Sequence, residues 1–335
     1  MNLLTNSSLK CYRRCQRLYY LRYMLGYRAA VEDEALRIGS LIHLGREAWF
    51  NGIIAGLRGD ELLAFALAAM AGESDPFDRA RAEALMIGYH ARWEGEALEI
   101  LAVEVEFRAP MINPATGKES RTWTLGGKLD GIVCQDGRKL IDELKSSSED
   151  VSAGSSYQKR LRMDGQVSMY FRGAHALGYD VEGCLYDVIG KPALRPLKAT
   201  PIESRKFTKD GKLYAAQRDA DESPESFKAR VMESIAENPE KYFSRFEVAR
   251  LQTEIDEHAQ DIWQTAQSIR NSILRNVWPR NPDSCQMYNR DCTFFGPCTG
   301  EASLDDREKF TQVEQVHSEL SATPIFDNSV VMDRY

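Results

Sequence analysis

Asp130, Glu143 and Lys145 combine acidic and basic side chains at a spacing that could bring all three together. They lie in residues 125–146, where Asp136-Gly137 is a strong hairpin-turn signal between two β-prone runs. Because side chains alternate across a strand, Glu143 and Lys145 point to the same face. The hairpin brings Asp130 level with this pair, so we expect two carboxylates and a lysine to share one face at a sheet edge.

Such a group has a definite chemical use. Two carboxylates make a hard-oxygen site for Mg²⁺ or Mn²⁺, and these ions keep positions open for water and phosphate oxygens. An adjacent lysine can orient an attacking water and offset the charge on a phosphate during its hydrolysis. The alternative is an ordinary hairpin with a solvated charged face, and this pattern alone does not separate the two interpretations.

The composition is typical of a globular protein. The chain has 335 residues, of which 43% are hydrophobic and 28% are charged, enough for one elaborated domain or two small ones. No run approaches the roughly 18 apolar residues of a membrane span, and the N-terminus lacks the apolar core of a signal peptide. We therefore expect a cytoplasmic protein with no membrane association.

The charge is unevenly distributed. A formal net charge of −7 argues against a protein that coats DNA, but nucleic-acid affinity follows local basic patches. Residues 10–28 carry six basic side chains and no acidic one, and residues 205–218 carry five basic side chains against Asp210 alone. Both segments are candidate DNA contacts, with two solvated faces as the alternative.

Hydrophobic periodicity predicts an α/β fold in which helices flank a central mixed sheet. The expected helices are 5–24, 33–51, 60–71, 77–100, 157–178, 224–236 and 252–275, and the expected strands are 101–109, 122–134, 139–145, 181–189 and 243–251. Residues 191–224 indicate an irregular excursion with a hairpin, and 310–320 could pack as a helix. Glu104 and Glu106 fall on the first strand, where solvated side chains are a simpler interpretation than metal ligands.

Cysteines gather near the C-terminus. Cys285, Cys292 and Cys298 fall within 14 residues of a loop rich in Pro, Gly, Asn and Asp, and such a loop stays ordered when something ties it down. In a cytoplasmic chain, metal ligation is more common than a disulfide. Cys11 or Cys15, on one side of the predicted first helix, could supply a fourth thiolate. An iron–sulfur cluster fits this count, and zinc is the alternative although no C-x2-C knuckle is present.

Several of these residues form an ordered series along the chain: Gly39-x3-His43, Asp130, Glu143-x-Lys145 and Gln166-x3-Tyr170. This order resembles the PD-(D/E)XK nuclease superfamily in its RecB-like branch. The cysteine triplet, together with an N-terminal Cys-Gln-Arg-Leu-Tyr-Tyr segment, is similar to members whose nuclease domain is clasped by a [4Fe–4S] cluster. Those members include AddB-type helicase–nuclease subunits, CRISPR-associated adaptation nucleases and phage-encoded exonucleases. The resemblance covers roughly residues 5–300.

The resemblance implies a role for each residue. His43, Asp130 and Glu143 would be Mg²⁺ or Mn²⁺ ligands, joined by the Leu144 carbonyl, and Lys145 would position or activate the water. Gln166 and Tyr170 would line the DNA channel. The cluster ligands would be Cys15, Cys285, Cys292 and Cys298. Cys15 matches the family better than Cys11, because the family's cysteine precedes a short run containing Arg and Tyr. A histidine hydrogen-bonded in the core is the alternative for His43.

The family frequently has C-x2-C-x5-C at the C-terminus and Pro after the N-terminal cysteine. Here the first spacing is six residues, and Gln16 replaces the Pro.

The expected architecture is a restriction-endonuclease-like core within a single nuclease domain of residues 1–300, followed by a tail of residues 301–335. Residues 1–100 would be the helical N-terminal part, 101–200 the core, and 201–300 the C-terminal helices and cysteines. A cluster would tie the N-terminal helices to the Cys-rich loop.

The expected function is a metal-dependent DNA exonuclease that leaves 5′-phosphate and 3′-hydroxyl ends in recombination, repair or phage DNA processing. A single-strand annealing or recombination protein is the partner that this function suggests. The alternatives are a catalytically silent DNA-binding subunit, an endonuclease of the same superfamily and a zinc-stabilised structural protein.

Overall fold

A mixed six-stranded β-sheet forms the centre of the molecule, as expected. The computed structural model describes residues 2–31, 33–287 and 290–320. β4 (Glu119–Gln135) pairs along one edge with antiparallel β3 (Glu99–Ile112). Its other edge pairs first with parallel β1 (Asn2–Leu4) and then with antiparallel β5 (Arg138–Ser147). β6 (Gly183–Gly190) runs parallel to β5, and β7 (Phe243–Val248) is antiparallel to β6.

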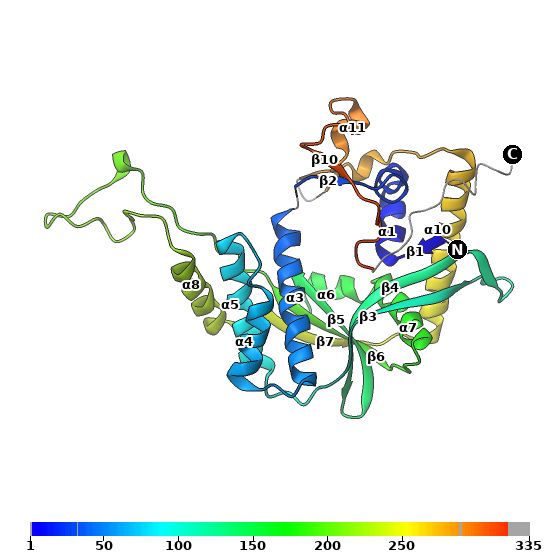
Figure 1. Cartoon of the computed structure of the whole chain (residues 1–335), viewed down its shortest axis with the longest axis horizontal. Coiled ribbons are helices and arrows are strands. Elements are labelled where there is room, and N and C mark those ends of the chain that lie inside the picture. The colour runs from blue at the N-terminus through cyan, green and yellow to red at the C-terminus, as the bar shows by residue number, and fades with distance from the viewer. Residues whose placement is uncertain (1, 32, 288–289, 321–335) are drawn as a thin grey trace.

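Two layers of helices cover the sheet (Figure 1). The first layer holds α3 (Glu34–Ile54), α4 (Gly59–Ala69), α5 (Pro76–Trp93) and α8 (Pro224–Glu237). The second holds α1 (Asn6–Arg14), α7 (Gly165–Ala176) and α10 (Gln252–Arg275). The alternation of side chains divides the strands between two cores: Leu140 and Leu144 pack with the first layer, and Ile141 packs with the second.

Short elements complete the chain. They are α2 (Gln16–Tyr19), a π-helix (Tyr20–Met24), β2 (Tyr27–Ala29), α6 (Ser156–Leu161), the 3₁₀ turns Ile202–Ser204 and Pro282–Ser284, α9 (Pro239–Tyr242), β8 (Gln286–Met287), β9 (Arg290–Asp291), α11 (Phe295–Thr299) and β10 (Phe310–Gln312). Across the described residues, no helix combines the length and the apolar character needed to span a membrane.

The predicted hairpin is present between β4 and β5. Asp136 and Gly137 have φ angles of 52° and 79°, the positive values that a tight two-residue hairpin turn requires. The ladder continues from this turn to the pair Gly131–Asp142. Asp130 therefore comes directly after the last paired residue, level with Glu143.

The prediction of one continuous helix over residues 5–24 is wrong. α1 ends at Arg14, Cys15 is extended (φ −163°, ψ 120°), and the chain then resumes as α2. The Arg17 N–H donates to the carbonyl of Pro279 at 3.0 Å instead of to the preceding turn. A hydrogen bond from a distant segment therefore replaces the helical one, and Cys11 and Cys15 do not share one side of a helix.

Two other predictions are corrected. The predicted helix 157–178 divides into α6 and α7, because the Asp164 carboxylate caps α7 by accepting from the Gln166 N–H at 3.0 Å. The helix suggested for 310–320 is absent, since β10 pairs with β2 and Phe310 packs against Leu21 and Phe294. The remainder of the predicted tail, residues 321–335, lies outside the described residues.

A buried ion pair fixes the first helical layer on the sheet. Arg46 of α3 donates to the Asp142 carboxylate of β5, and the two side chains are 2% and 0% exposed. Burial raises the pKa of Asp142 to about 6, although the Arg46 guanidinium opposes this shift. Because His43 lies one helical turn before Arg46, this pair also determines where His43 stands.

We expect Arg46→Ala to lower the free energy of unfolding by about 3–5 kcal/mol, because it leaves the Asp142 carboxylate buried and unpaired. Chemical denaturation measures this change. Lys198→Ala is the control: it breaks the exposed Lys198–Asp221 pair, and its cost should stay below about 1 kcal/mol. Equal losses in the two variants would contradict the anchoring role of Arg46.

Candidate active site

The β4–β5 hairpin places the two predicted acidic residues side by side. The Asp130 carboxylate accepts a hydrogen bond from the backbone N–H of Leu144 at 2.9 Å. This bond fixes Asp130 against the Glu143–Leu144 step of the neighbouring strand. The role predicted for the Leu144 carbonyl in metal binding stays a prediction.

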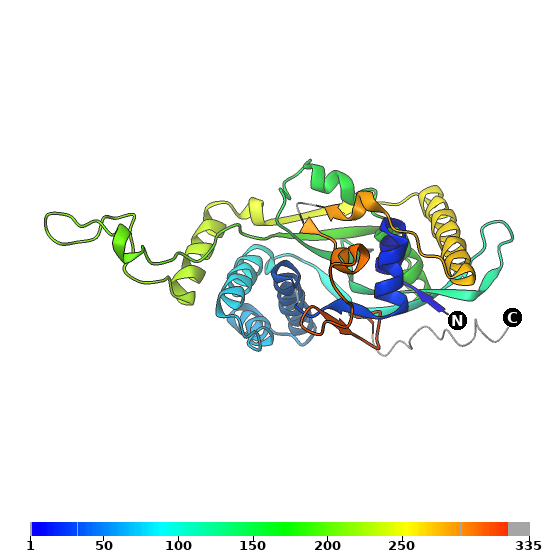
Figure 2. The same cartoon turned by 90° about the horizontal axis from the view of Figure 1, so that it is seen from above.

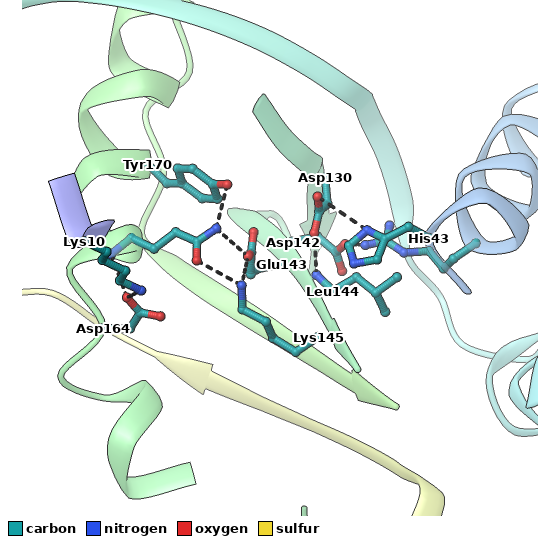
Figure 3. Close-up of polar contacts among 11 residues, drawn as sticks. Lys10, His43, Asp130, Asp142, Glu143, Leu144, Lys145, Asp164 and Tyr170 are labelled. Atoms are coloured by element: carbon teal, nitrogen blue, oxygen red, sulfur yellow. Dashed lines mark hydrogen bonds and ion pairs between the residues drawn. The ribbon is translucent and has the colours of Figure 1, made fainter. Parts of the chain in front are cut away.

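Glu143, Lys145, Gln166 and Tyr170 form one hydrogen-bonded network between β5 and α7 (Figure 3). Lys145 Nζ donates to Glu143 Oε1 and, at 2.9 Å, to Gln166 Oε1. Gln166 Nε2 lies 2.9 Å from Glu143 Oε1 and 2.7 Å from the Tyr170 hydroxyl. The sequence placed these residues on one strand face and one helix face, and the structure brings the two faces together.

The surroundings of Glu143 disfavour the charged form of its carboxylate. Its side chain is 2% exposed. Burial raises the pKa of Glu143 to about 8, Asp130 shifts it in the same direction, and Lys145 opposes the shift. Its Oε2 atom is buried without a hydrogen-bond partner among the described residues. An acceptor oxygen that is buried without a hydrogen-bond partner is suited to bind a cation.

His43 approaches the same group from α3. His43 Nδ1 lies 3.8 Å from Asp130 Oδ1, and its side chain is 37% exposed. Partial burial lowers the pKa of His43, while Asp130 acts in the opposite direction. The neutral ring is therefore favoured, and a neutral imidazole is the form that binds metals.

Glu104 is the residue that sequence reasoning did not select. One potential ligand atom from each of His43, Glu104 and Asp130 lies within 4.8 Å of the other two, so Glu104 is no solvated strand residue. Its φ is +49°, a left-handed conformation that costs energy within a strand. Burial raises its pKa, and Lys128 forms an ion pair with it.

The position of Glu104 follows from register. It stands between the pairs Val103–Gly131 and Val105–Leu129 and so lies opposite Asp130. In the sequence, Glu104 and Glu106 alternate along β3, but only the pairing of β3 with β4 shows that Glu104 lies beside Asp130. His43, Glu104 and Asp130 offer one imidazole and two carboxylates within 4.8 Å of one another, a donor set that fits Mg²⁺ or Mn²⁺. Glu143 adds a third carboxylate on the neighbouring strand, level with Asp130.

α1 contacts the site through its basic face. Lys10 Nζ lies 2.7 Å from the Asp164 carboxylate, which caps the helix that carries Gln166 and Tyr170 (Figure 3). Lys10 is half-exposed. The N-terminal basic segment therefore begins beside the active site.

The four predicted cluster ligands meet at a second location. A small cavity is lined by Cys15, Cys285, Cys292 and Cys298, whereas Cys11 is not part of its lining. Burial raises the pKa of Cys292 and Cys298, and the neighbouring thiols add to both shifts. Among the described residues, no three of these sulfurs lie within 4.8 Å of one another. Tetrahedral zinc with bonds of 2.3 Å would need spacings of about 3.8 Å.

Comparisons with known proteins complete the description. The solved structures that are similar to this chain include "SSO0001" (14% identity, 78% of this chain and 84% of that chain covered, TM-score 0.27) and a phage-related exonuclease from Haemophilus somnus 129PT (16% identity, 70% and 94% covered, TM-score 0.29). No curated protein matches. The PD-(D/E)XK nuclease superfamily matches residues 4–298, which include both groups of residues described above. The chain belongs to the PD-(D/E)XK nuclease superfamily.

Proposed function

We propose that this nuclease is a metal-dependent DNA exonuclease whose active site is the acidic group on β3, β4 and β5. One observation carries the metal site: the buried Oε2 of Glu143 has no hydrogen-bond partner among the described residues and belongs to a carboxylate whose pKa is raised. His43, Glu104 and Asp130 add three further ligands within reach of one another.

These four residues would hold Mg²⁺ or Mn²⁺. When bound, the metal supplies a Lewis acid and lowers the pKa of a coordinated water, which generates the nucleophile for phosphodiester hydrolysis. The protein contributes the fixed positions of the ligands. The Leu144 N–H orients Asp130, and the Gln166 amide orients Glu143.

Lys145 acts as a fixed cation. Burial lowers its pKa, but Glu143 beside it more than offsets this, so the pKa of Lys145 is raised overall. A lysine that stays protonated cannot remove a proton from water. It can orient the water and offset negative charge on the phosphate as the leaving oxygen departs. Gln166 holds Lys145 Nζ in place, and Tyr170 in turn fixes the amide of Gln166.

Lys145→Ala should lower the rate of nucleotide release from end-labelled linear DNA with Mg²⁺ by about 10²–10³-fold, because it removes a preorganised cation from the reacting phosphate. Lys159→Ala, which removes an exposed lysine on α6, should cut at the wild-type rate.

The products separate the alternatives. Mononucleotides released from one labelled end establish an exonuclease and its polarity. Internal fragments establish an endonuclease. Folded wild-type protein that cuts neither way would be a DNA-binding subunit, and the proposal would be wrong.

Metal affinity should increase with pH. Glu143 must lose its proton to bind a cation, and burial raises its pKa to about 8. Below that pH a proton competes with the metal, so Mn²⁺ affinity should rise about tenfold per pH unit up to roughly pH 8. The lowered pKa of His43 favours its neutral, metal-binding ring. Calorimetric titration of wild type and Glu143→Gln measures the effect: the variant should bind weakly and with a shallower profile, because only Glu104, whose pKa burial also raises, then adds to the slope. The same slope in both would contradict this role of Glu143.

We also propose that Cys15, Cys285, Cys292 and Cys298 hold a [4Fe–4S] cluster with a structural role. Four thiols around one cavity are the donor set of such a cluster, and the sequence has no C-x2-C knuckle of the kind that structural zinc sites usually contain. Arg14 and Arg17 shift the pKa of Cys292 and Cys298 downward, respectively, in opposition to burial. Both cations would therefore stabilise thiolates.

Cys285→Ala should remove absorbance near ~400 nm and lower the melting temperature by roughly 10 °C. Cys15 and Cys285 are 270 positions apart, and closing a loop of that length stabilises the folded chain by about 5 kcal/mol. Cys11→Ala is the matched control and should keep colour and stability. If purified Cys285→Ala kept the wild-type colour and melting temperature, the cluster assignment would be wrong. If the wild type were colourless and contained zinc, these cysteines would form a zinc site.

The cellular role follows from the chemistry. An enzyme that digests DNA ends would act in the cytoplasm in recombination, repair or phage DNA processing, and a single-strand annealing or recombination protein would receive its product. These assignments are part of the proposal and depend on exonuclease action.

A further inference from the structure

Residues 191–222, here called the arm, project from the body of the protein. The arm leaves the sheet after Gly190, the last residue of β6, and returns at Pro224, the first residue of α8. Figures 1 and 2 show it extending away from the helices and the sheet in both views. Neither of the two main cores includes a fully buried residue of the arm.

The arm is anchored at the catalytic end of the sheet. β5 and β6 are parallel, with Lys145 opposite Val188 and Ser147 opposite Gly190. The N–H of Lys191 donates to the Ser147 carbonyl at 2.6 Å. The arm therefore starts at the same end of the strands as the catalytic lysine, a few residues beyond it.

The returning end of the arm is equally well fixed. Arg230 of α8 forms a 2.8 Å ion pair with the buried Glu222. α8 packs on α5, and Lys228 forms a 2.8 Å ion pair with Glu83. An arm with both ends held in this way keeps a defined direction relative to the active site.

The two sides of the arm are bonded to each other. Backbone hydrogen bonds join Thr200 to Arg218 (2.9 Å), Thr208 to Lys212 (2.7 Å) and Tyr214 to Lys206 (3.1 Å). Phe207 and Leu213 form a β-bridge below the turn. The arm is thus a preformed ribbon, and its tip presents side chains to solvent.

Most exposed side chains of the tip are basic or aromatic, and Asp210 in the turn is the one acidic residue among residues 205–218. Lys206, Lys209 and Lys212 are exposed and form no ion pair within the described part of the chain. Phe207 and Tyr214 are 58% and 49% exposed. Two of the acidic residues of the arm are already paired with basic side chains, Asp221 with Lys198 and Glu222 with Arg230.

This chemistry matches a nucleic acid. Lysines bind phosphates and aromatic rings stack on bases, and a basic stripe interleaved with aromatic residues is the usual footprint of a DNA contact. A chain with a formal net charge of −7 that concentrates positive charge on a projecting ribbon has charge complementarity to DNA at that location.

We propose that the arm is a second DNA-binding element, which contacts the phosphate backbone of the substrate outside the active site. This inference rests on the proposed function. About 15 residues on each side of the ribbon span at most ~50 Å when extended, a length of roughly 15 base pairs. The arm therefore contacts DNA that continues past the few nucleotides at the metal site.

The test compares Lys206→Ala/Lys209→Ala/Lys212→Ala with a control that removes three exposed lysines elsewhere, Lys118→Ala/Lys139→Ala/Lys309→Ala. Each protein is assayed on a duplex of about 8 base pairs and one of about 60, below and above the reach of the arm. The arm variant should raise KM for the long duplex about tenfold, with kcat unchanged and the short duplex unaffected. The control should behave as wild type on both.

Binding of the long duplex in EDTA, measured by fluorescence anisotropy against salt, tests the inference without cleavage. Each lysine–phosphate contact contributes about 0.9 to the slope of log affinity against log salt, so the arm variant should lose about 2–3 from that slope. A wild type that cuts neither these duplexes nor their separated strands would overturn the proposed function, while the salt slopes would still decide the role of the arm.

Wild-type slopes and KM values in the arm variant would overturn the arm inference alone. A changed sedimentation coefficient with unchanged DNA affinity would overturn it as well, because the arm would then join copies of the chain.

Discussion

The burial of two consecutive carboxylates in β5 is the constraint on which the rest of this structure depends. Asp142 and Glu143 are neighbours in sequence, so the strand directs them to opposite faces of the sheet, and both are almost fully buried. A buried carboxylate is costly without compensating partners. Each helical layer supplies a partner for one carboxylate. Arg46 of α3 pairs with Asp142, and Gln166 of α7 bonds Glu143, which also pairs with Lys145 of β5 itself. The candidate active site is therefore held by both layers.

The charges of the two carboxylates are compensated differently, which indicates a structural role for Asp142 and a role in the candidate active site for Glu143. Asp142 is paired with a guanidinium deep in the core, next to Asp187 and Arg245, which form their own ion pair. Glu143 keeps one oxygen unpartnered and faces Asp130. Burial raises the pKa of both Glu143 and Glu104. Such crowding of acidic groups is unfavourable in the metal-free protein, and the divalent cation proposed for this site would relieve it.

Prediction from sequence succeeded where the physics is local. The Asp136-Gly137 turn fixed the hairpin, and strand alternation placed Glu143 and Lys145 on one face. Helical spacing placed Gln166 beside Tyr170. Prediction failed where distant segments decide. Glu104 joins the site through the register of β3 on β4 and a positive φ that no propensity favours.

The break at Cys15 shows how a distant contact changes a local prediction and its consequences. The 5–24 segment has helical periodicity, but the Pro279 carbonyl captures the Arg17 N–H and the helix stops at Arg14. Extended Cys15 then lines the cavity with the C-terminal cysteines. The same short segment also contacts α7, because Lys10 of α1 forms an ion pair with Asp164, the residue that caps α7.

α1 therefore connects the cysteine cavity to the active site. Its nine residues span about 13 Å at 1.5 Å per residue, with Cys15 directly after one end and Lys10 within the helix. Tyr12 of α1 stacks edge-on against Tyr19, which in turn stacks on Trp278 before the cysteine loop. These packed rings and the Lys10–Asp164 ion pair form one continuous series of contacts from the C-terminal loop through α1 to the cap of α7. Gln166, which bonds both Glu143 and Lys145, follows that cap by two positions, so α1 packs against the cysteine region at one end and against the helix that carries Gln166 along its length.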